Sequence, residues 1–284
     1  MKTALILEGG AMRGLFTAGV LDYFTEKKLS FDLAVGVSAG AAFGCNLKSH
    51  QKGRVLRYNT TYCRDKRYCS LKNLLTTGDL YGADFCYRML PDVLDPFDYE
   101  SYREDPCDFW CVCTDAESAE PVYKQINSLT NDEFLYMRAS ASLPLVSRAV
   151  EVDGRRLLDG GISDSIPLDF AKRMGADKCV LILTRPKGYR KKPIAAKALI
   201  RLLLRKSPRL ADAICTRHVR YNRTVEQIED AEGRGEVFVI RPSAPIDVRV
   251  AERDSSRLAR AHAEGLKHAE NAFDALLAYL NKVE

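Results

Sequence analysis

The sequence predicts a single three-layer α/β/α domain with a mainly parallel central sheet. The first observation is the apolar run Thr3–Leu7, which is followed by the glycine-rich turn Gly9–Gly14 and by apolar residues at helical spacing. The second is that the same order returns at once, with the apolar run Leu33–Val35, the turn Gly36–Gly40 and an alanine-rich helix. Two successive strand–turn–helix units favour parallel strands with right-handed crossovers, so both turns open at the carboxyl edge of the sheet. We therefore expect the two turns to face one crevice.

Later apolar runs supply the remaining strands and the last helix. Val150–Val152 and Arg155–Leu158 flank Asp153-Gly154, a dipeptide that is typical of hairpin turns. Pro167 suits the first turn of the next helix. The other predicted elements are strands at Phe109–Cys113, Val122–Ile126, Cys179–Leu183 and Glu236–Ile240, and a closing helix with the apolar stripe Leu258, His262, Leu266, Ala269, Phe273, Leu276 and Leu280.

The composition is that of an ordinary globular protein. The chain has 284 residues, of which 46% are hydrophobic and 29% charged, and this balance argues against wholesale disorder. The first apolar run stops at Glu8 and lacks the length and cleavage site of a signal peptide, and no stretch approaches the roughly 18 apolar residues of a transmembrane helix. We therefore expect a cytoplasmic protein. Its nine cysteines are odd in number and include no C-x-x-C pair, so we expect reduced, mostly buried thiols and no metal site.

Ser38 stands at the centre of a G-x-S-x-G motif, Gly36-Val37-Ser38-Ala39-Gly40, directly after an apolar run. A serine hydroxyl is a poor nucleophile unless it is exposed and lies beside a base. Gly36 and Gly40 allow a sharp turn without Cβ clashes and leave room for a substrate carbonyl group. The motif predicts a nucleophilic serine at a strand-to-helix elbow. The alternative is that Ser38 only caps the N-terminus of the following helix.

The turn Gly9-Gly10-Ala11-Met12-Arg13-Gly14 is the second component of the predicted site. Acyl transfer builds an oxyanion, and backbone N–H groups in a glycine turn before a helix can stabilise it. Two phosphate-binding alternatives fail on the sequence. A dinucleotide fingerprint needs glycine where Ala11 stands, and a Walker loop needs Lys and Ser or Thr where Leu15 and Phe16 stand. We therefore predict that this turn forms an oxyanion hole.

Histidine is a poor candidate for the general base. A serine–histidine–acid triad of the α/β-hydrolase type would place its nucleophile after several strands, whereas only two strands precede Ser38. His262 falls on the apolar stripe of the last helix, and His218 lies in an arginine-rich segment. His50 and His268 have no evident partner in the sequence.

Asp159 is the preferred base. It follows a short apolar strand and precedes Gly160 and Gly161, so its carboxylate can stand close to another backbone in a crevice. A partly desolvated carboxylate that is hydrogen-bonded to a serine can take the proton directly. The alternative is that Asp159 merely caps a turn. Together with Ser38 and the glycine turn, it predicts a two-residue catalytic dyad.

These motifs, in this order, resemble the patatin-like phospholipase family. The segment Arg138–Pro144 and the run from Asp159 through Asp164 to Pro167 add to the resemblance, which covers roughly residues 3–184. The resemblance implies a hydrolase of lipid acyl esters, with Ser38 as nucleophile and Asp159 as proton acceptor. It also implies an oxyanion hole at the backbone of Gly10, Ala11 and Met12, assisted by Arg13.

The chain departs from the family pattern at Ala11, where the family usually has a third glycine. A methyl group there is compatible with N–H donation only at a negative φ. On this interpretation residues 1–184 form the catalytic domain. Residues 185–284 supply the rest of the same domain, namely a basic surface helix, the last strand and the closing helix.

Residues 185–223 form a strongly basic segment. They hold thirteen Lys or Arg against one acid, Asp212, a local charge of +12, so the remainder of a chain of net charge +5 carries about −7. Within the segment, 194–205 predicts a helix with Lys197, Arg201 and Arg205 on one narrow face and leucines on the opposite side. Such a helix can lie on an anionic bilayer. The alternative is a lid packed on the domain; nucleic acid is not expected as a partner, because no aromatic residues are interleaved.

The predicted function is the hydrolysis of a fatty acyl ester, in a phospholipid or a related lipid, through an acyl-serine intermediate and without a metal or cofactor. Acyl transfer to an alcohol, a general carboxylesterase activity and a catalytically idle lipid-binding role stay open. The residues that line the substrate pocket are expected from 51–105 and 185–225, where the sequence predicts least.

Overall fold

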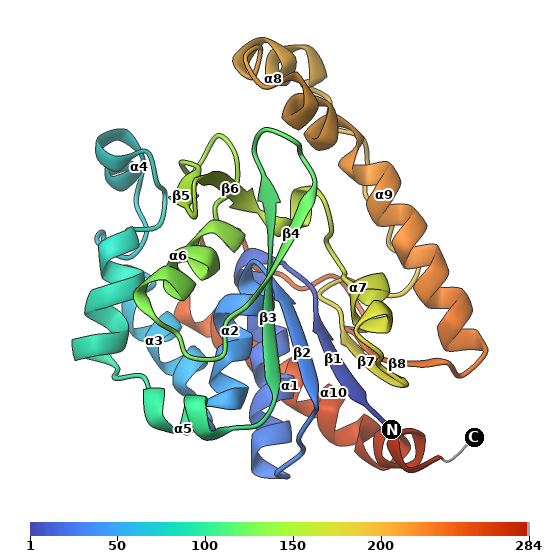
Figure 1. Cartoon of the computed structure of the whole chain (residues 1–284). Coiled ribbons are helices and arrows are strands. Elements are labelled where there is room, and N and C mark those ends of the chain that lie inside the picture. The colour runs from blue at the N-terminus through green and yellow to red at the C-terminus, as the bar shows by residue number, and fades with distance from the viewer. Residues whose placement is uncertain (283–284) are drawn as a thin grey trace.

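The computed structural model describes residues 1–282, so the last two residues of the predicted C-terminal segment lie outside it. Its centre is one sheet with the strand order β5-β6-β3-β2-β1-β7-β8, and β4 pairs with β3 (Figure 1). Neighbours from β3 through β2, β1 and β7 to β8 are parallel, whereas β3–β4, β3–β6 and β5–β6 are antiparallel. The strands are β1 (Thr3–Leu7), β2 (Leu33–Val37), β3 (Asp108–Asp115), β4 (Pro121–Gln125), β5 (Val150–Val152), β6 (Arg155–Asp159), β7 (Lys178–Ile182) and β8 (Val237–Ile240).

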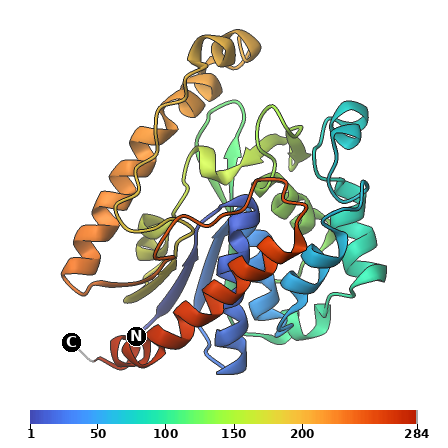
Figure 2. The ribbon, with the colours of Figure 1, turned by 180° about the vertical axis from the view of Figure 1, so that it is seen from behind.

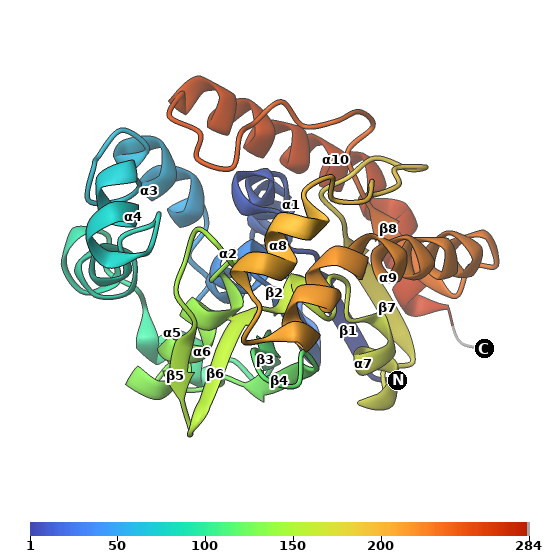
Figure 3. The same ribbon diagram turned by 90° about the horizontal axis from the view of Figure 1, so that it is seen from above.

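Helices cover both faces of the sheet, which confirms the predicted three-layer fold (Figures 1 and 3). Alternation along β1 shows the two faces, because Leu5 and Leu7 belong to one buried cluster and Ala4 and Ile6 to another. The α-helices are α1 (Gly14–Glu26), α2 (Ala39–Lys48), α3 (Arg54–Tyr62), α4 (Leu71–Thr77), α5 (Tyr99–Glu104), α6 (Asn131–Ser140), α7 (Leu168–Arg173), α8 (Lys197–Leu203), α9 (Pro208–Gly233) and α10 (Ser255–Asn281). Short helical turns are η1 (Ala11–Arg13) and η3 (Gly160–Ile162), and η2 (Phe85–Leu94) is a π-helix.

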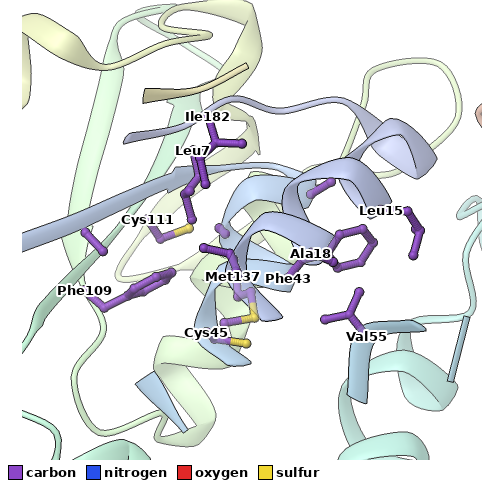
Figure 4. Packing of buried hydrophobic residues seen from close by; sticks show 14 of the residues in the cluster. Leu7, Leu15, Ala18, Phe43, Cys45, Val55, Phe109, Cys111, Met137 and Ile182 are labelled. Carbon is purple, nitrogen blue, oxygen red and sulfur yellow. The ribbon is translucent and has the colours of Figure 1, made fainter. Parts of the chain in front are cut away.

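The larger buried cluster lies between the sheet and the helices α1, α2, α6 and α10. Figure 4 shows Leu7 and Phe109 of the sheet near Phe43 and Cys45 of α2, with Met137 of α6 beside them. Eight of the nine cysteines are buried, as expected. Burial raises the pKa of Cys45 to about 12, so this thiol stays protonated and behaves as a small apolar side chain.

The closing helix α10 packs against α1 along its length (Figure 2). Two glycines permit the contact. A Cβ atom on Gly19 of α1 would lie 2.0 Å from the carbonyl oxygen of His262, and one on Gly265 of α10 would lie 1.9 Å from that of Phe16. His262 is buried here and bonds Asp22 at 2.6 Å, so it is a partnered core histidine, as its place on the apolar stripe predicts.

Most predicted elements are present within a residue or two, including the Asp153-Gly154 hairpin, both of whose turn residues have positive φ. Pro167 is the N-cap of α7 and not a residue of its first turn. The predicted helix 194–205 is wrong in extent, because α8 covers only Lys197–Leu203 and Arg205 lies beyond its end. Within residues 1–282 no helix combines the length and apolar character that a bilayer crossing requires.

Candidate active site

Ser38 sits at a strained elbow between β2 and α2. Its φ of 55° and ψ of −122° are costly for a residue with a side chain, by about 1–3 kcal/mol. Both flanking positions must be glycine, because neighbouring backbone leaves no room for a Cβ atom there. A Cβ atom on Gly36 would lie 2.6 Å from the backbone of Ala41, and one on Gly40 would lie 2.4 Å from the carbonyl oxygen of Leu7. The Ser38 side chain makes no capping hydrogen bond, so the alternative of a simple N-cap serine is not supported.

A second serine fixes the elbow from the far side of β3. The backbone N–H of Ser38 donates to Ser140 Oγ at 2.8 Å, and that hydroxyl donates to the carbonyl oxygen of Val112 at 2.6 Å. Ser140 ends α6 and belongs to the segment Arg138–Pro144 that the sequence resemblance singled out. Since the serine is fully buried, its hydrogen bonds hold the elbow backbone against β3.

Strand pairing brings Asp159 to the same edge of the sheet. Val37 at the end of β2 pairs with Val112 of β3, and the next residue of β3, Cys113, pairs with Asp159 at the end of β6. The backbones of Ser38 and Asp159 therefore flank β3, roughly 10 Å apart at the usual strand spacing. The Asp159 side chain is 2% exposed, and its Oδ1 accepts a hydrogen bond from Gly161 N at 2.8 Å.

The two acceptor oxygens of Asp159 differ. Oδ1 is occupied, whereas Oδ2 is buried and has no hydrogen-bond partner among residues 1–282. Burial raises the pKa of the carboxyl group, while Arg217 and the hydroxyl of Ser38 lower it. The hydroxyl is thus close enough to influence the carboxylate, although the pair does not form a hydrogen bond of ordinary geometry. Such looseness is common in enzymes without substrate.

No histidine in the described part of the chain forms a hydrogen bond or ion pair with Ser38 or Asp159. His262 is held by Asp22, and His50 pairs with Asp105 at 3.2 Å on the surface. His268 lies 3.3 Å from Ser243, and His218 has a buried, unpartnered Nδ1 on α9. The carboxylate is therefore the group in a position to serve Ser38 as a base.

The glycine turn contacts the elbow directly. A Cβ atom on Gly9 would lie 2.9 Å from the carbonyl oxygen of Val37 and 3.0 Å from Cβ of Ser38. The turn opens through η1 into α1, and Arg13 N donates to the carbonyl oxygen of Gly10 at 3.1 Å. The N–H groups of Gly10, Ala11 and Met12 bond to no acceptor in the described residues, so they are free for an oxyanion.

Ala11 corrects one expectation about this turn. Its φ is +48°, whereas the sequence argument allowed N–H donation only at a negative φ. The direction of the N–H group is set by the backbone and not by Cβ, so the methyl group does not remove the donor. Its cost is strain of about 1–2 kcal/mol for a left-handed residue with a side chain.

An apolar pocket opens at Ser38 on the α2 side of the sheet. Ala11, Met12 and Ser38 are among the residues that line it. The prediction that the pocket is lined from 51–105 and 185–225 is right for the first range and wrong for the second. Residues of 51–105 line it, but its other walls come from residues 129–147 and Val250 and not from 185–225. Representative lining residues are Tyr58, Tyr81, Leu90, Phe97, Phe134 and Met137.

Arg217 on α9 is a neighbour of the dyad that the sequence did not reveal. A Cβ atom on Gly161 would lie 2.6 Å from Nη2 of Arg217 and 2.9 Å from Oδ1 of Asp159, so the guanidinium group lies beside the carboxylate. Its Nε is buried without a partner. Arg217 belongs to no motif, and the sequence shows only that it lies in the basic segment 185–223.

Comparison with known proteins defines the class. The family model described as patatin-like phospholipase matches residues 5–172, which is more than half of the chain. The protein therefore belongs to the patatin-like phospholipase family, hydrolases that act on lipid esters. A second model, described as a domain of unknown function (DUF6363), matches residues 207–281.

Individual relatives are more distant. The chain is 30% identical to the uncharacterized protein YjjU of Escherichia coli, over 86% of this chain and 70% of that protein. It is 25% identical to lysophospholipase nte1 of Aspergillus fumigatus, over 61% of this chain but 11% of that protein. The solved structure of VipD from Legionella pneumophila aligns with a TM-score of 0.46 and 11% identity, covering 96% of this chain and 67% of VipD.

Proposed function

We propose that the protein is a lipid acyl hydrolase of the phospholipase A or lysophospholipase type that works through a Ser38–Asp159 dyad. The observation that carries this proposal is the free, buried Oδ2 of Asp159 beside the hydroxyl at the strained elbow. A buried carboxylate with a raised pKa is a better base than an exposed one. The apolar pocket that reaches Ser38 has the chemistry to hold an acyl chain.

The reaction has two halves. Asp159 removes the proton from Ser38 Oγ as this oxygen attacks the ester carbonyl, and the N–H groups of Gly10, Ala11 and Met12 stabilise the oxyanion. The carbon–oxygen bond to the alcohol then breaks, and Asp159 returns the proton to the leaving alkoxide. In the second half, water gives a proton to Asp159 as it attacks the acyl-serine carbonyl; the bond between the acyl carbon and Ser38 Oγ then breaks, Asp159 returns the proton to Ser38 Oγ, and the fatty acid leaves.

A fluorophosphonate probe tests the dyad without knowledge of the lipid. We expect the probe to label the wild type, to fail with Ser38→Ala, and to react at least about 100-fold more slowly with Asp159→Asn. Asp153→Asn, on the exposed tip of the β5–β6 hairpin, is the matched control. His218→Ala tests the competing base. Full reactivity of Asp159→Asn, together with a loss in His218→Ala, would overturn the assignment.

We propose further that α8 docks the enzyme on anionic lipid. Leu199, Leu202 and Leu203 are 53%, 65% and 57% exposed, and α8 stands away from the body of the molecule (Figures 1 and 2). Only Ile200 of this helix is buried, so a lid packed on the domain is the less favoured alternative. Exposed Arg201 and Arg205 flank the leucines, and each such cation near an anionic bilayer contributes about 1 kcal/mol. The cytoplasmic leaflet, which carries anionic lipid, is the surface that we propose.

Vesicle co-sedimentation measures this docking. We expect binding to phosphatidylglycerol vesicles and little to phosphatidylcholine vesicles. Leu202→Ser should lower the partition coefficient about tenfold, because a leucine side chain is no longer buried in the lipid. Val93→Ser, at a 70% exposed valine of η2, is the matched control. Equal binding to both kinds of vesicle contradicts the proposal.

We also propose that residues 185–284 belong to the catalytic domain and not to a separate one. Three contacts within the described residues support this. β8 pairs with β7 and so extends the central sheet, α10 packs on α1, and α9 brings Arg217 to Asp159.

A further inference from the structure

Four cationic side chains gather beside the glycine turn on the α9 side of the sheet. Arg13 ends η1 and is the N-cap of α1, Arg185 follows β7, Lys191 lies in the loop before α8, and Arg217 lies on α9. Arg185 and Lys191 lie over two aromatic rings, with the guanidinium carbon 4.5 Å from the centre of the Tyr189 ring and Nζ 4.0 Å from that of Tyr221. The two rings meet edge to face at 6.1 Å.

Arg217 lies beside the Asp159 carboxylate, whereas Arg13, Arg185 and Lys191 form no ion pair with a carboxylate in the described part of the chain. Among residues 1–282 none of the four donates a side-chain hydrogen bond to a carboxylate, although the charge of Glu8 acts on Arg13 and Lys191 and Arg217 acts on Asp159. Nε of Arg13 and Nε of Arg217 are buried and have no acceptor among the residues that the structure describes. A buried charged donor without an acceptor is costly, by more than the 1–3 kcal/mol of a neutral group, and such groups are usually completed by an ordered water, an ion or a ligand.

The two nearby acids are already engaged. Glu8 accepts hydrogen bonds from Thr184 N at 2.6 Å and from the Tyr221 hydroxyl at 2.8 Å, and Asp159 belongs to the dyad. Four cations against two carboxylates leave a local excess of two positive charges when Lys191 is protonated. Burial and the charge of Arg217 lower the pKa of Lys191 to about 7, as expected for a lysine crowded by like charges.

The cationic cluster and the apolar pocket lie on different sides of the reacting serine. Tyr189 and Tyr221 pack with the buried cluster beneath α7 and α9, whereas Met12 and Phe43 belong to the cluster beneath α2. Figure 3 shows α9 and α3 on opposite sides of the central strands. None of the four cationic residues lines the apolar pocket. A substrate ester at Ser38 can therefore place its acyl chain on one side and its headgroup on the other.

We propose that Arg13, Arg185, Lys191 and Arg217 form an anion subsite that binds the phosphate group of the lipid substrate. This inference rests on the proposed hydrolase function. It assigns to the enzyme a preference for phosphate-bearing acyl esters over neutral glycerides. Free phosphate shares the same chemistry, and the experiment below separates the two sources.

The test compares two substrates that differ in the phosphate group. 1-Oleoyl-lysophosphatidylglycerol and 1-oleoylglycerol are presented in the same neutral detergent micelles at pH 6.5, and kcat/KM is measured for each. We expect the wild type to favour the phosphodiester, and Lys191→Met and Arg185→Gln each to lower the ratio of the two kcat/KM values about tenfold or more. Lys192→Met, which removes a charge from the exposed neighbouring position, keeps the ratio of the wild type.

Calorimetry with inorganic phosphate supplies a readout that does not depend on turnover. We expect phosphate to bind the wild type and to bind Lys191→Met far more weakly. Phosphate binding without any substrate preference would mean a site for the free anion and would overturn the headgroup assignment. Equal ratios in Lys191→Met and Lys192→Met would also overturn it. Absence of any hydrolysis, with fluorophosphonate labelling also absent, would instead contradict the proposed hydrolase function.

Discussion

At the scale of single residues, the candidate dyad depends on groups other than Ser38 and Asp159 themselves. Ser140 holds the elbow backbone of Ser38, and Gly161 occupies one oxygen of Asp159. Arg217 acts on the protonation of that carboxylate, because its positive charge opposes the effect of burial on the pKa. The pKa of the candidate base Asp159 is thus lowered by Arg217, a residue of the much later helix α9.

Removal of the Arg217 charge should change the pH profile. In Arg217→Gln the pKa of Asp159 rises further, so the carboxylate is protonated and inactive over a wider acidic range. We expect the acid limb of kcat/KM for a neutral nitrophenyl ester to move to higher pH, while Arg217→Lys keeps it near the wild-type position. An acid limb that is unmoved in Arg217→Gln would show that this residue does not tune the base.

At the scale of elements, the contact between α1 and α10 fixes the helix that follows the glycine turn, since α1 begins where that turn ends. Gly19 and Gly265 allow the two backbones to touch, and neither position has room for a methyl group. The hydrogen bond between His262 and Asp22 lies in the same interface.

Gly19→Ala should therefore destabilise the fold despite the better helix propensity of alanine. We expect a loss of about 2–4 kcal/mol in the free energy of unfolding, because the new Cβ would have to displace backbone. Gly233→Ala is the matched control, since a Cβ atom there meets nothing within 4 Å, and it should add up to about 1 kcal/mol. Urea denaturation measures both, and equal effects of the two substitutions would contradict the proposed role of the contact.

At the scale of the whole molecule, the anion subsite is assembled from four distant stretches of chain. The groups that face Lys191 are Arg217 and Tyr221 on α9, Arg13 at the start of α1, Arg185 after β7 and Glu8 after β1. Burial first, and then the charges of Arg217, Arg13 and Arg185, lower the pKa of Lys191 from the ordinary 10.5 to about 7, while Glu8 acts in the opposite direction.

The preference for a phosphodiester substrate should consequently depend on pH. Below pH 7 Lys191 is charged, whereas above it anion binding must be accompanied by uptake of a proton, so affinity falls with rising pH. We expect KM for lysophosphatidylglycerol to rise between pH 7 and 9, where the charge of this substrate is constant. Lys191→Arg, which stays charged, should flatten this rise. The same slope in both proteins would show that another group titrates.

The parts of the fold that could be predicted are those with a local cause. Gly36, Gly40 and Gly160 mark places where another backbone approaches, and a single sequence shows such places as motifs. Arg217 carries no such mark, because its meeting with Asp159 depends on how α9 lies across the sheet. The pocket walls at residues 129–147 were missed for the same reason, and the sequence left open whether the leucines of 194–205 are exposed or packed on the domain. Helical spacing predicts which residues share one side of a helix, but it does not predict which other element packs against that side.

The glycine contact between α1 and α10 can form only after α10 has been synthesised, long after α1. α1 ends at Glu26 and α10 begins at Ser255, so at the usual rate of translation the second helix leaves the ribosome about ten seconds or more after the first. During that interval the side of α1 that packs against α10 is uncovered, and the candidate oxyanion turn precedes a helix without its partner. Hydrolytic activity should therefore appear late in synthesis, which would keep a nascent lipid-cleaving enzyme idle until residues 255–281 have been made.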